Sequence, residues 1–292
     1  MSERAQKPDD LLILSDNTFM GEVPVMTHSS VEFNGVGNVL FCEKGVTLRD
    51  SRIVFNGSGG LVYLSSSKHS ICAEVFVWND STFFLGENSY INPGEPLHAI
   101  ASERKSIFIG DDALISFGVW MRTADPHLVY SVHDLRRINQ SKSIVVGDHV
   151  WLGQQAMLLK GTVVGSGSIV SARAVCAGKR IPSNTSWAGN PARQISKDVF
   201  FSKRSAHAFD AERTKHFETF RKRDYIFRPS RSATDVLTEV DGILSSDDSP
   251  SQRAERLGAL HFGDVDHDRF AVAAERSEGI LTGLFRRRRA RL

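Results

Sequence analysis

The stretch VGDHVWLGQQAMLLKGTVVGSGSIVSARAVC, residues 146–176, decides the fold, because similar residue types return in it at every sixth position. The leading positions are aliphatic or sulfur-bearing: Val146, Leu152, Leu158, Val164, Val170 and Cys176. Four positions after each of the first five lies a small or β-branched residue: Val150, Ala156, Thr162, Ser168 and Ala174. An α-helix repeats at about 3.6 residues and a strand at about 2, so neither accounts for this period. The repeat predicts a parallel β-helix, in which each hexapeptide forms one wall of a prism.

The repeat continues upstream with changes of phase, and each change requires an inserted or deleted stretch. Solenoids place such stretches in loops that leave the corners of the coils. The longest predicted loop runs from Arg122 to Ser143 and is rich in His, Asp and Arg. Loops of this length inside a compact domain are usually functional, so we expect this one to carry part of a site.

The regular repeat ends after Ile181, where the turn-forming residues 182–184 and 189–193 follow. We therefore predict an N-terminal lead-in over residues 1–30, a β-helix over 31–195, and a mainly helical extension over 196–292. The extension holds six phenylalanines within a short span, too many for a disordered linker. We expect them to pack on the β-helix or on a neighbouring subunit: Phe200, Phe201, Phe209, Phe217, Phe220 and Phe227.

Composition limits the class of protein. A formal net charge of +2 over 292 residues gives no argument for nucleic-acid binding. Cys42, Cys72 and Cys176 are odd in number and far apart, which argues against a disulfide framework or a cysteine zinc site. Cys72 and Cys176 fit apolar wall positions and are expected to be packed thiols. The N-terminus has no apolar core typical of a signal peptide, and no run is apolar enough to span a membrane. The cytoplasm is the expected compartment.

Several motifs resemble those of the hexapeptide-repeat acyltransferases. They are Arg137-Ile138-Asn139, Asp148-His149-Val150-Trp151, Leu159-Lys160-Gly161 and Ala188-Gly189-Asn190-Pro191-Ala192-Arg193. The resemblance is strong over about 105–195, looser over 31–104, and absent from the C-terminal third. It implies a left-handed β-helix, a homotrimer and the use of acetyl-CoA without a metal. Within that family the chain is most similar to O-acetyltransferases of bacterial capsule and cell-surface glycans, which carry a Thr/Ser-Asp-x-His stretch; here it is Thr123-Ala124-Asp125-Pro126-His127.

The resemblance assigns the general base to His127. A sugar hydroxyl is a poor nucleophile until its proton is removed, and an imidazole is suited to removing it near neutral pH. Asp125 and Asp134 are candidates to orient the second ring nitrogen of His127. Trp151 matches a tryptophan that lies beside the acetyl group or the acceptor in related enzymes, and its indole N–H can donate to a developing oxyanion.

Other roles for the histidines stay open at this stage. His133 is an alternative base, and His149 is expected to be a surface turn residue or an interface contact. Together with His127 they also allow a zinc site like that of β-helical carbonic anhydrases. The chain lacks the His-Gly-Cys element of those proteins, so the motifs favour an acyltransferase without metal.

Acetyl-CoA would need both backbone donors and cations. Small residues at a coil edge let the pantetheine arm approach the backbone, which suggests Gly153, Ser171 and Ala172. Basic residues near the C-terminal coils are available for the phosphates: Lys160, Arg173, Lys179, Arg180 and Arg193.

We therefore expect an acetyl-CoA-dependent O-acetyltransferase that acts on a surface polysaccharide or its sugar precursor. The alternatives are an N-acetyltransferase on an amino or nucleotide sugar, and a β-helical scaffold without catalysis. Arg286 to Arg289, after Leu284 and Phe285, leave open a weak contact with the inner face of an anionic membrane or a disordered tail.

Overall fold

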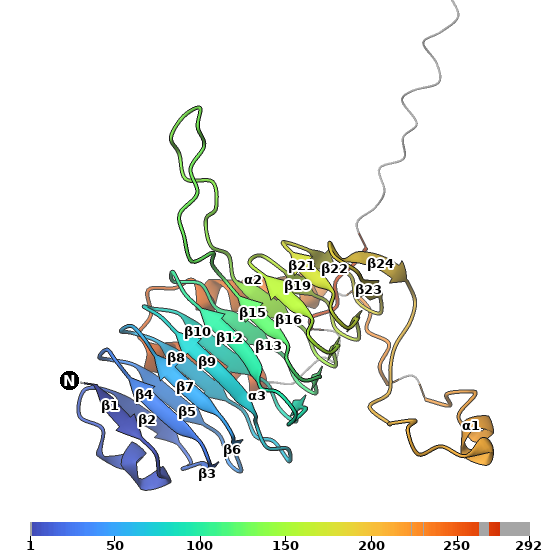
Figure 1. Cartoon of the computed structure of the whole chain (residues 1–292), viewed down its shortest axis with the longest axis horizontal. Helices are drawn as coiled ribbons and strands as arrows, with labels where there is room; N and C mark the ends of the chain where they lie inside the picture. The colour runs from blue at the N-terminus through green and yellow to red at the C-terminus, as the bar shows by residue number, and fades with distance from the viewer. Residues whose placement is uncertain (1, 223, 230, 263–268, 275–292) are drawn as a thin grey trace, which may run out of the picture.

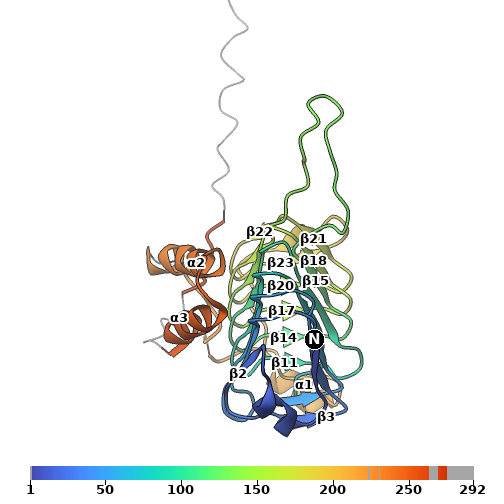
Figure 2. The same cartoon turned by 90° about the vertical axis from the view of Figure 1, so that its left-hand side faces the viewer.

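The computed structural model describes residues 2–222, 224–229, 231–262 and 269–274. The chain winds as a parallel β-solenoid of triangular cross-section, as the six-residue period predicts (Figures 1 and 2). We name its three walls A, B and C. In each complete coil the chain passes from wall B to wall C and then to wall A.

The walls are parallel sheets that run the length of the solenoid. Wall A consists of β1 (Glu3–Ala5), β4 (Ser30–Phe33), β7 (Arg52–Phe55), β9 (Ala73–Val77), β12 (Leu97–Ala101), β15 (Trp120–Arg122), β18 (Met157–Leu159) and β21 (Val175–Ala177). Wall B consists of β2 (Thr18–Gly21), β5 (Val39–Cys42), β8 (Leu61–Leu64), β10 (Thr82–Leu85), β13 (Ile107–Ile109), β16 (Ile144–Val146), β19 (Val163–Val164) and β22 (Arg180–Ile181). Wall C consists of β11 (Tyr90–Ile91), β14 (Leu114–Ile115), β17 (Trp151–Leu152), β20 (Ile169–Val170), β23 (Ser186–Ala188) and β24 (Arg193–Ser196), with the pair β3 (Val25–Thr27) and β6 (Thr47–Arg49) in the same place in the earliest coils.

Antiparallel pairs close the solenoid at both ends. Strand β1 pairs antiparallel with β4, and β24 pairs antiparallel with β23. The 3₁₀ helix η1 (Pro8–Ile13) covers the first coil with the buried side chain of Leu11. The predicted lead-in, residues 1–30, is thus built into the walls, since β1, β2 and β3 lie within it.

The interior of the prism is apolar, and the predicted leading positions of the repeat lie inside it. Val146, Leu152, Leu158, Val164, Val170 and Cys176 are all buried in one continuous core. A small hydroxyl residue at a corner can bond to the next coil. The Oγ1 of Thr162, for example, donates to the carbonyl of Cys176 at 2.9 Å. Burial raises the pKa of the Cys176 thiol to about 11, so this cysteine is a packed, protonated side chain as predicted.

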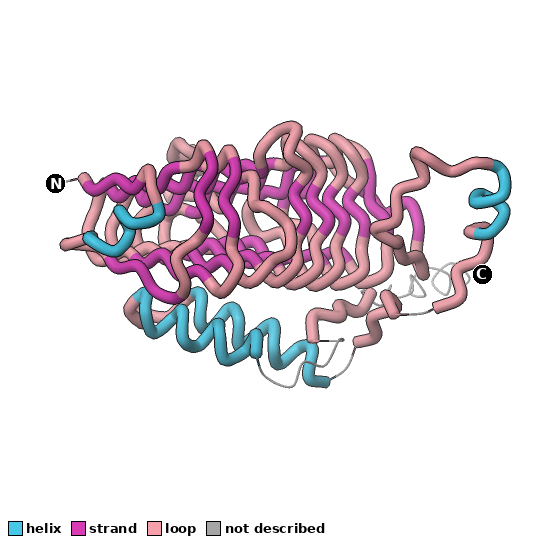
Figure 3. Tube along the Cα trace, turned by 90° about the horizontal axis from the view of Figure 1, so that it is seen from below, coloured by secondary structure: helices cyan, strands magenta, loops and turns pink. Residues whose placement is uncertain are grey.

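The C-terminal extension covers wall B. Helices α2 (Arg231–Leu244) and α3 (Pro250–Phe262) lie along this wall (Figures 2 and 3). They cover a ladder of outward aromatic rings in which Phe84 lies 4.8 Å from Tyr63 and 4.5 Å from Phe108, measured between ring centroids. Arg253 of α3 is buried and donates to the Asp80 carbonyl at 3.0 Å and to the Thr82 hydroxyl at 2.8 Å.

The rest of the described extension divides into a segment that packs and an arm that projects. Phe201 and Phe227 are buried against the corner between walls B and C, as predicted. Phe209 and Phe217 instead contact each other, 5.1 Å apart, in the arm around α1 (Ala211–His216), and Phe217 stays 40% exposed. None of the helices in the described ranges is long and apolar enough to cross a bilayer. The run from Arg286 to Arg289 lies outside the described residues.

Candidate functional site

The predicted loop is the most prominent departure from the solenoid. It leaves wall A after Arg122, projects well beyond the coils, and returns to wall B at Ile144 (Figure 1). Its two arms form a hairpin, with an antiparallel bridge between Tyr130 and Arg137. The far end exposes apolar side chains, with Val132 86% exposed and Leu135 78% exposed.

His127 lies in the first arm of this loop, close to the solenoid. Its backbone carbonyl accepts a hydrogen bond from Asn139 Nδ2 at 2.8 Å, which fixes the backbone at this position. The side chain is exposed, and the imidazole has no hydrogen-bond partner among the residues that the structure describes. A base that must accept a proton from an incoming hydroxyl needs this combination of a fixed backbone and an accessible ring.

Asn139 connects the two arms of the loop. Its side-chain oxygen accepts from the backbone N–H of Val129 at 2.9 Å, and its Nδ2 donates to Asp125 at 3.0 Å as well as to His127. The side chain is buried, so these bonds are shielded from water. The Arg-Ile-Asn motif pointed to this residue, but the sequence alone did not assign it a role.

Asp125 is held by Lys160 rather than by the ring of His127. Lys160 Nζ donates to Asp125 Oδ2 at 2.5 Å and to the Asn139 carbonyl at 3.1 Å. The hydrogen bond from Lys160, and to a smaller extent the bond from Asn139, hold the pKa of Asp125 below its usual range. Within one chain, Asp125 and Lys160 therefore fasten the loop to the coil, and Asp134 lies further along the loop beside Arg136.

A second clasp holds the other side of the loop base. Glu103 forms an ion pair with Arg137 and accepts from the Ser141 hydroxyl. The bond from Arg137, and to a smaller extent the bond from Ser141, lower the pKa of Glu103 to about 2. Nearby, Nε of Arg122 is buried and has no hydrogen-bond partner within the described ranges.

Trp151 lies on wall C with its ring directed outward and 37% exposed. Its indole N–H donates to the Ser116 hydroxyl at 3.4 Å, and Phe201 lies 5.7 Å away. The loop that carries His127 leaves the solenoid between walls A and B. One chain thus holds Trp151 and His127 on different parts of the prism.

The small residues proposed for the pantetheine arm share the corner between walls C and A. A Cβ on Gly153 would lie 2.5 Å from the backbone nitrogen of Ala172, so successive coils approach each other here as only glycine permits. Ser171 is half-buried, whereas Ala172 and Arg173 are exposed. Arg173 donates to the side chain of Gln155 at 3.0 Å.

The proposed cations are divided between two corners. Lys160 and Lys179 lie between walls A and B, on the side of His127, whereas Arg173 lies between walls C and A and Arg193 begins β24. Wall A separates these two groups within one chain. The structure therefore brings His127, Asp125 and Lys160 together and leaves Gly153, Ser171 and Ala172 at the opposite edge of that wall.

His149 is a turn residue, as predicted, but it is buried rather than on the surface. Its φ is 49°, and its Nδ1 lies 2.6 Å from Asp112 Oδ2. The ring is stacked between Phe201 and Tyr225, with centroids 4.2 and 3.8 Å away. His149 thus anchors the extension to the coil, which is not the role of a metal ligand. In the described part of the chain, no group of three or more His, Cys, Asp or Glu side chains could hold a metal ion.

Comparison with known proteins extends these observations. No family model matches the chain. The chain is 28% identical over 195 residues to a polysialic acid O-acetyltransferase of Escherichia coli O1:K1, covering 60% of this chain and 62% of that protein. It is 25% identical over 127 residues to a polysialic acid O-acetyltransferase of Neisseria meningitidis, covering 44% and 58%. The chain thus spans about three fifths of the length of these two relatives.

A solved structure gives the corresponding result for the fold. The crystal structure of the polySia-specific acetyltransferase NeuO superposes with a TM-score of 0.58 at 26% identity, covering 69% of this chain and 93% of that one. The chain therefore has the left-handed parallel β-helix fold of hexapeptide-repeat acetyltransferases, and its resemblance to glycan O-acetyltransferases is confirmed in both sequence and structure.

Proposed function

We propose that the protein transfers the acetyl group of acetyl-CoA to a hydroxyl of a bacterial surface polysaccharide or of its sugar precursor, with His127 as the general base. The observation that carries the proposal is the geometry of His127. Its backbone is fixed by the buried Asn139, while its imidazole stays exposed on a projecting loop. The two relatives named for polysialic acid make an acidic polysaccharide the first acceptor to test.

The proposed reaction is a direct acyl transfer. His127 removes the proton of a sugar hydroxyl as the hydroxyl oxygen attacks the thioester carbonyl carbon. The carbon–sulfur bond then breaks, and the sulfur leaves with that proton as free CoA. A donor such as the Trp151 indole N–H would stabilise the oxyanion that forms at the carbonyl oxygen.

A homotrimer with its sites at the seams between subunits would complete this arrangement. His127 and the Gly153–Ala172 corner lie at opposite edges of wall A, so a second copy must supply one of them. The loop end exposes Val132 and Leu135, which a neighbouring subunit would cover. The resemblance supplies the number three, and closed symmetry suits such a head-to-tail contact. The proposed compartment is the cytoplasm.

Acetyl transfer to defined acceptors tests the proposal. The purified full chain is incubated with acetyl-CoA and with polysialic acid, neutral polysaccharides or amino sugars, and both free thiol and acetylated product are measured. We expect His127→Ala to lower kcat by about 100-fold or more, because general-base catalysis contributes about 10²–10⁴-fold. His133→Ala, in the same loop, should keep kcat.

The alternatives give different results in the same assay. Transfer only to amines would support the N-acetyltransferase, and no thiol release with any acceptor would support the scaffold. A His127→Ala variant that keeps more than about a tenth of wild-type kcat would exclude the assigned base.

A further inference from the structure

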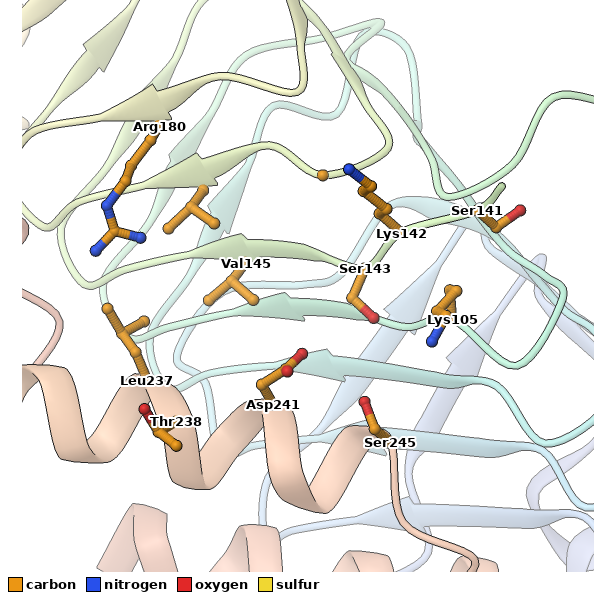
Figure 4. Close-up of a pocket in the computed structure, with 12 residues that line it drawn as sticks. Lys105, Ser141, Lys142, Ser143, Val145, Arg180, Leu237, Thr238, Asp241 and Ser245 are labelled. Carbon is orange, nitrogen blue, oxygen red and sulfur yellow. The ribbon is translucent and has the colours of Figure 1, made fainter. Parts of the chain in front are cut away.

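A cavity of 570 Å³ lies between helix α2 and wall B, directly beside the base of the His127 loop (Figure 4). Strands β16 and β19 supply its floor through Val145 and Val163, and the end of the loop supplies Lys142 and Ser143. In Figure 4, Arg180 and Lys142 lie on the strand side and Asp241 faces them from the helix. The cavity is therefore built jointly by the β-helix and the C-terminal extension.

The cavity is rich in uncompensated positive charge. Lys105, Lys142 and Arg180 line it, against the single carboxylate of Asp241. No ion pair joins any of these three cations to another residue in the ranges that the structure describes. Cations that converge without carboxylate partners favour a bound anion, and a guanidinium in particular suits a carboxylate.

The rest of the lining favours a sugar over a bare ion. Val145, Val163 and Leu237 offer an apolar surface for the carbons of a pyranose ring. The hydroxyls of Ser143 and Ser245 and the carboxylate of Asp241 can bond to sugar hydroxyls and amide N–H groups. A carboxylate-bearing sugar matches the cations, the apolar surface and the hydrogen-bonding groups of the lining.

The cavity is coupled to His127 through a short series of contacts. Asn139 holds the carbonyl of His127 and also accepts, through its own carbonyl, from Lys160. The next residue, Gly161, lines the cavity, where a Cβ at that position would lie 3.0 Å from the Lys142 side chain. A polymer seated in the cavity would therefore lie beside the loop that carries the base.

We propose that this cavity is an acceptor subsite that binds a carboxylate-bearing sugar of an acidic glycan, with Arg180 and Lys142 as the main contacts to the carboxylate. The inference rests on the proposed function and narrows its substrate class to acidic chains. It also assigns a role to helix α2, which closes the subsite with Asp241 and Leu237.

Binding measured without acetyl-CoA separates the subsite from the chemistry. Calorimetric titration of the full chain uses oligosialic acid, oligogalacturonic acid and a neutral maltooligosaccharide. We expect the wild type to bind at least one acidic oligosaccharide, with affinity that falls as salt is added, and to bind the neutral one far more weakly. The double variant Arg180→Gln/Lys142→Gln should lose about tenfold or more of that affinity, and Lys44→Gln, at an exposed turn, should lose none.

Kinetics provide the second measurement. In the double variant the KM for the acidic acceptor should rise by about tenfold or more, while the KM for acetyl-CoA stays at the wild-type value. Equal binding of acidic oligosaccharides by the wild type and the double variant would overturn the subsite, as would wild-type binding of neither acidic probe. A loss of CoA binding instead would assign the cavity to the phosphates of the co-substrate and would also overturn it.

The proposed function can fail independently of the subsite. If the wild type binds acidic glycans through Arg180 and Lys142 but transfers no acetyl group to them, the subsite stands and the proposed reaction is wrong. If transfer is efficient and unaffected in the double variant, the reaction stands and the subsite is wrong. His127→Ala should leave the calorimetric affinity unchanged, because the base is not part of the cavity lining.

Discussion

Asn139 makes four hydrogen bonds with its side chain, to Val129, Arg137, Asp125 and His127, and all of these partners lie in the loop that carries His127. An amide suits this place because it accepts from one backbone N–H and donates to two oxygens at once. Aspartate in its ionised form could accept but not donate, and leucine could do neither. In the proposed reaction, Asn139 is therefore a positioning residue that would act through His127 and Asp125.

Substituting Asn139 should lower turnover more than stability. We expect Asn139→Ala to reduce kcat by about tenfold to 100-fold, since a misplacement of about 1 Å in a reacting group can cost about 10²-fold. The KM for acetyl-CoA should stay unchanged, because the Asn139 side chain is buried between the two arms of the loop and, among the residues that the structure describes, bonds only to residues of the loop. Steady-state kinetics with both substrates varied provide the check. A rise in KM with kcat intact would assign Asn139 to substrate binding instead.

The Glu103 clasp predicts a specific pH dependence. Its pKa is lowered from 4.5 to about 2 in the folded chain, chiefly by Arg137. The clasp therefore contributes stability that is fully present above about pH 4.5 and is lost as the pH falls towards 2. Because the side chain is partly exposed, we expect the effect on unfolding to be modest. Thermal unfolding of Glu103→Gln should show a weaker dependence on pH than the wild type between these values, and parallel curves would contradict the assignment.

At the scale of the elements, the segment after α3 is held by a buried ion network. Arg269 Nε donates to Asp148 Oδ2 at 3.1 Å, and its Nη2 donates to Asp111 Oδ2 at 2.5 Å. The carbonyl of Phe270 accepts from the backbone of Ser166, and that of Val272 accepts from Ser183. Residues 269–272 thus cross successive coils at the corner between walls B and C. Burial, as the largest cause, raises the pKa of Asp148 despite the nearby guanidinium.

Removing the guanidinium should destabilise the chain strongly. Arg269→Ala leaves the buried Asp148 without its cation, and breaking a buried pair in this way typically costs about 3–5 kcal/mol. The double variant Arg269→Met/Asp148→Asn should recover much of that loss, because it removes both charges. Urea denaturation of the two variants and the wild type measures the free energies of unfolding. An equal loss in the single and double variants would show that packing, rather than the uncompensated charge, is responsible.

The sequence predicted the elements of the solenoid well and those of the extension only in part. The six-residue period placed the leading positions of the repeat, from Val146 to Cys176, in the core, because the narrow prism admits few inward side chains per wall. The period contains no information about which wall the extension covers. A signal did exist in wall B, where Leu61-Val62-Tyr63-Leu64 and Ile107-Phe108-Ile109 are continuously apolar, as is typical of strands buried on both faces.

The sequence likewise predicted some features of the candidate site and not others. The motifs predicted His127 and Asp125 on one loop, and both are there. They could not predict that Lys160 holds Asp125, or that Asn139 joins the arms, because these contacts depend on the path of the loop back to the coil. The burial of His149 depends on Phe201 and Tyr225, whose packing no local pattern specifies.

For the whole molecule, helices α2 and α3 of the extension are part of the folded unit, because they pack on wall B. Truncation after Lys197 would uncover Tyr63, Phe84 and Phe108 on wall B, a contiguous apolar surface that favours aggregation. We expect the truncated chain to bind a hydrophobic dye and to lose solubility relative to the full chain. A soluble truncated chain with no added dye binding would contradict the idea that α2 and α3 shield this wall.

In the proposed trimer, His127 of one subunit acts on acetyl-CoA held at the coil corner of another. Mixing two inactive variants tests it directly: His127→Ala, which lacks the base, and Ala172→Trp, which blocks the corner. After unfolding and refolding an equal mixture, native mass spectrometry verifies mixed trimers, and acetyl transfer is measured. Random mixing leaves about one seam in four with both parts intact, so we predict recovery of about a quarter of wild-type activity. A mixture of verified mixed trimers that is no more active than its two parents would contradict the account.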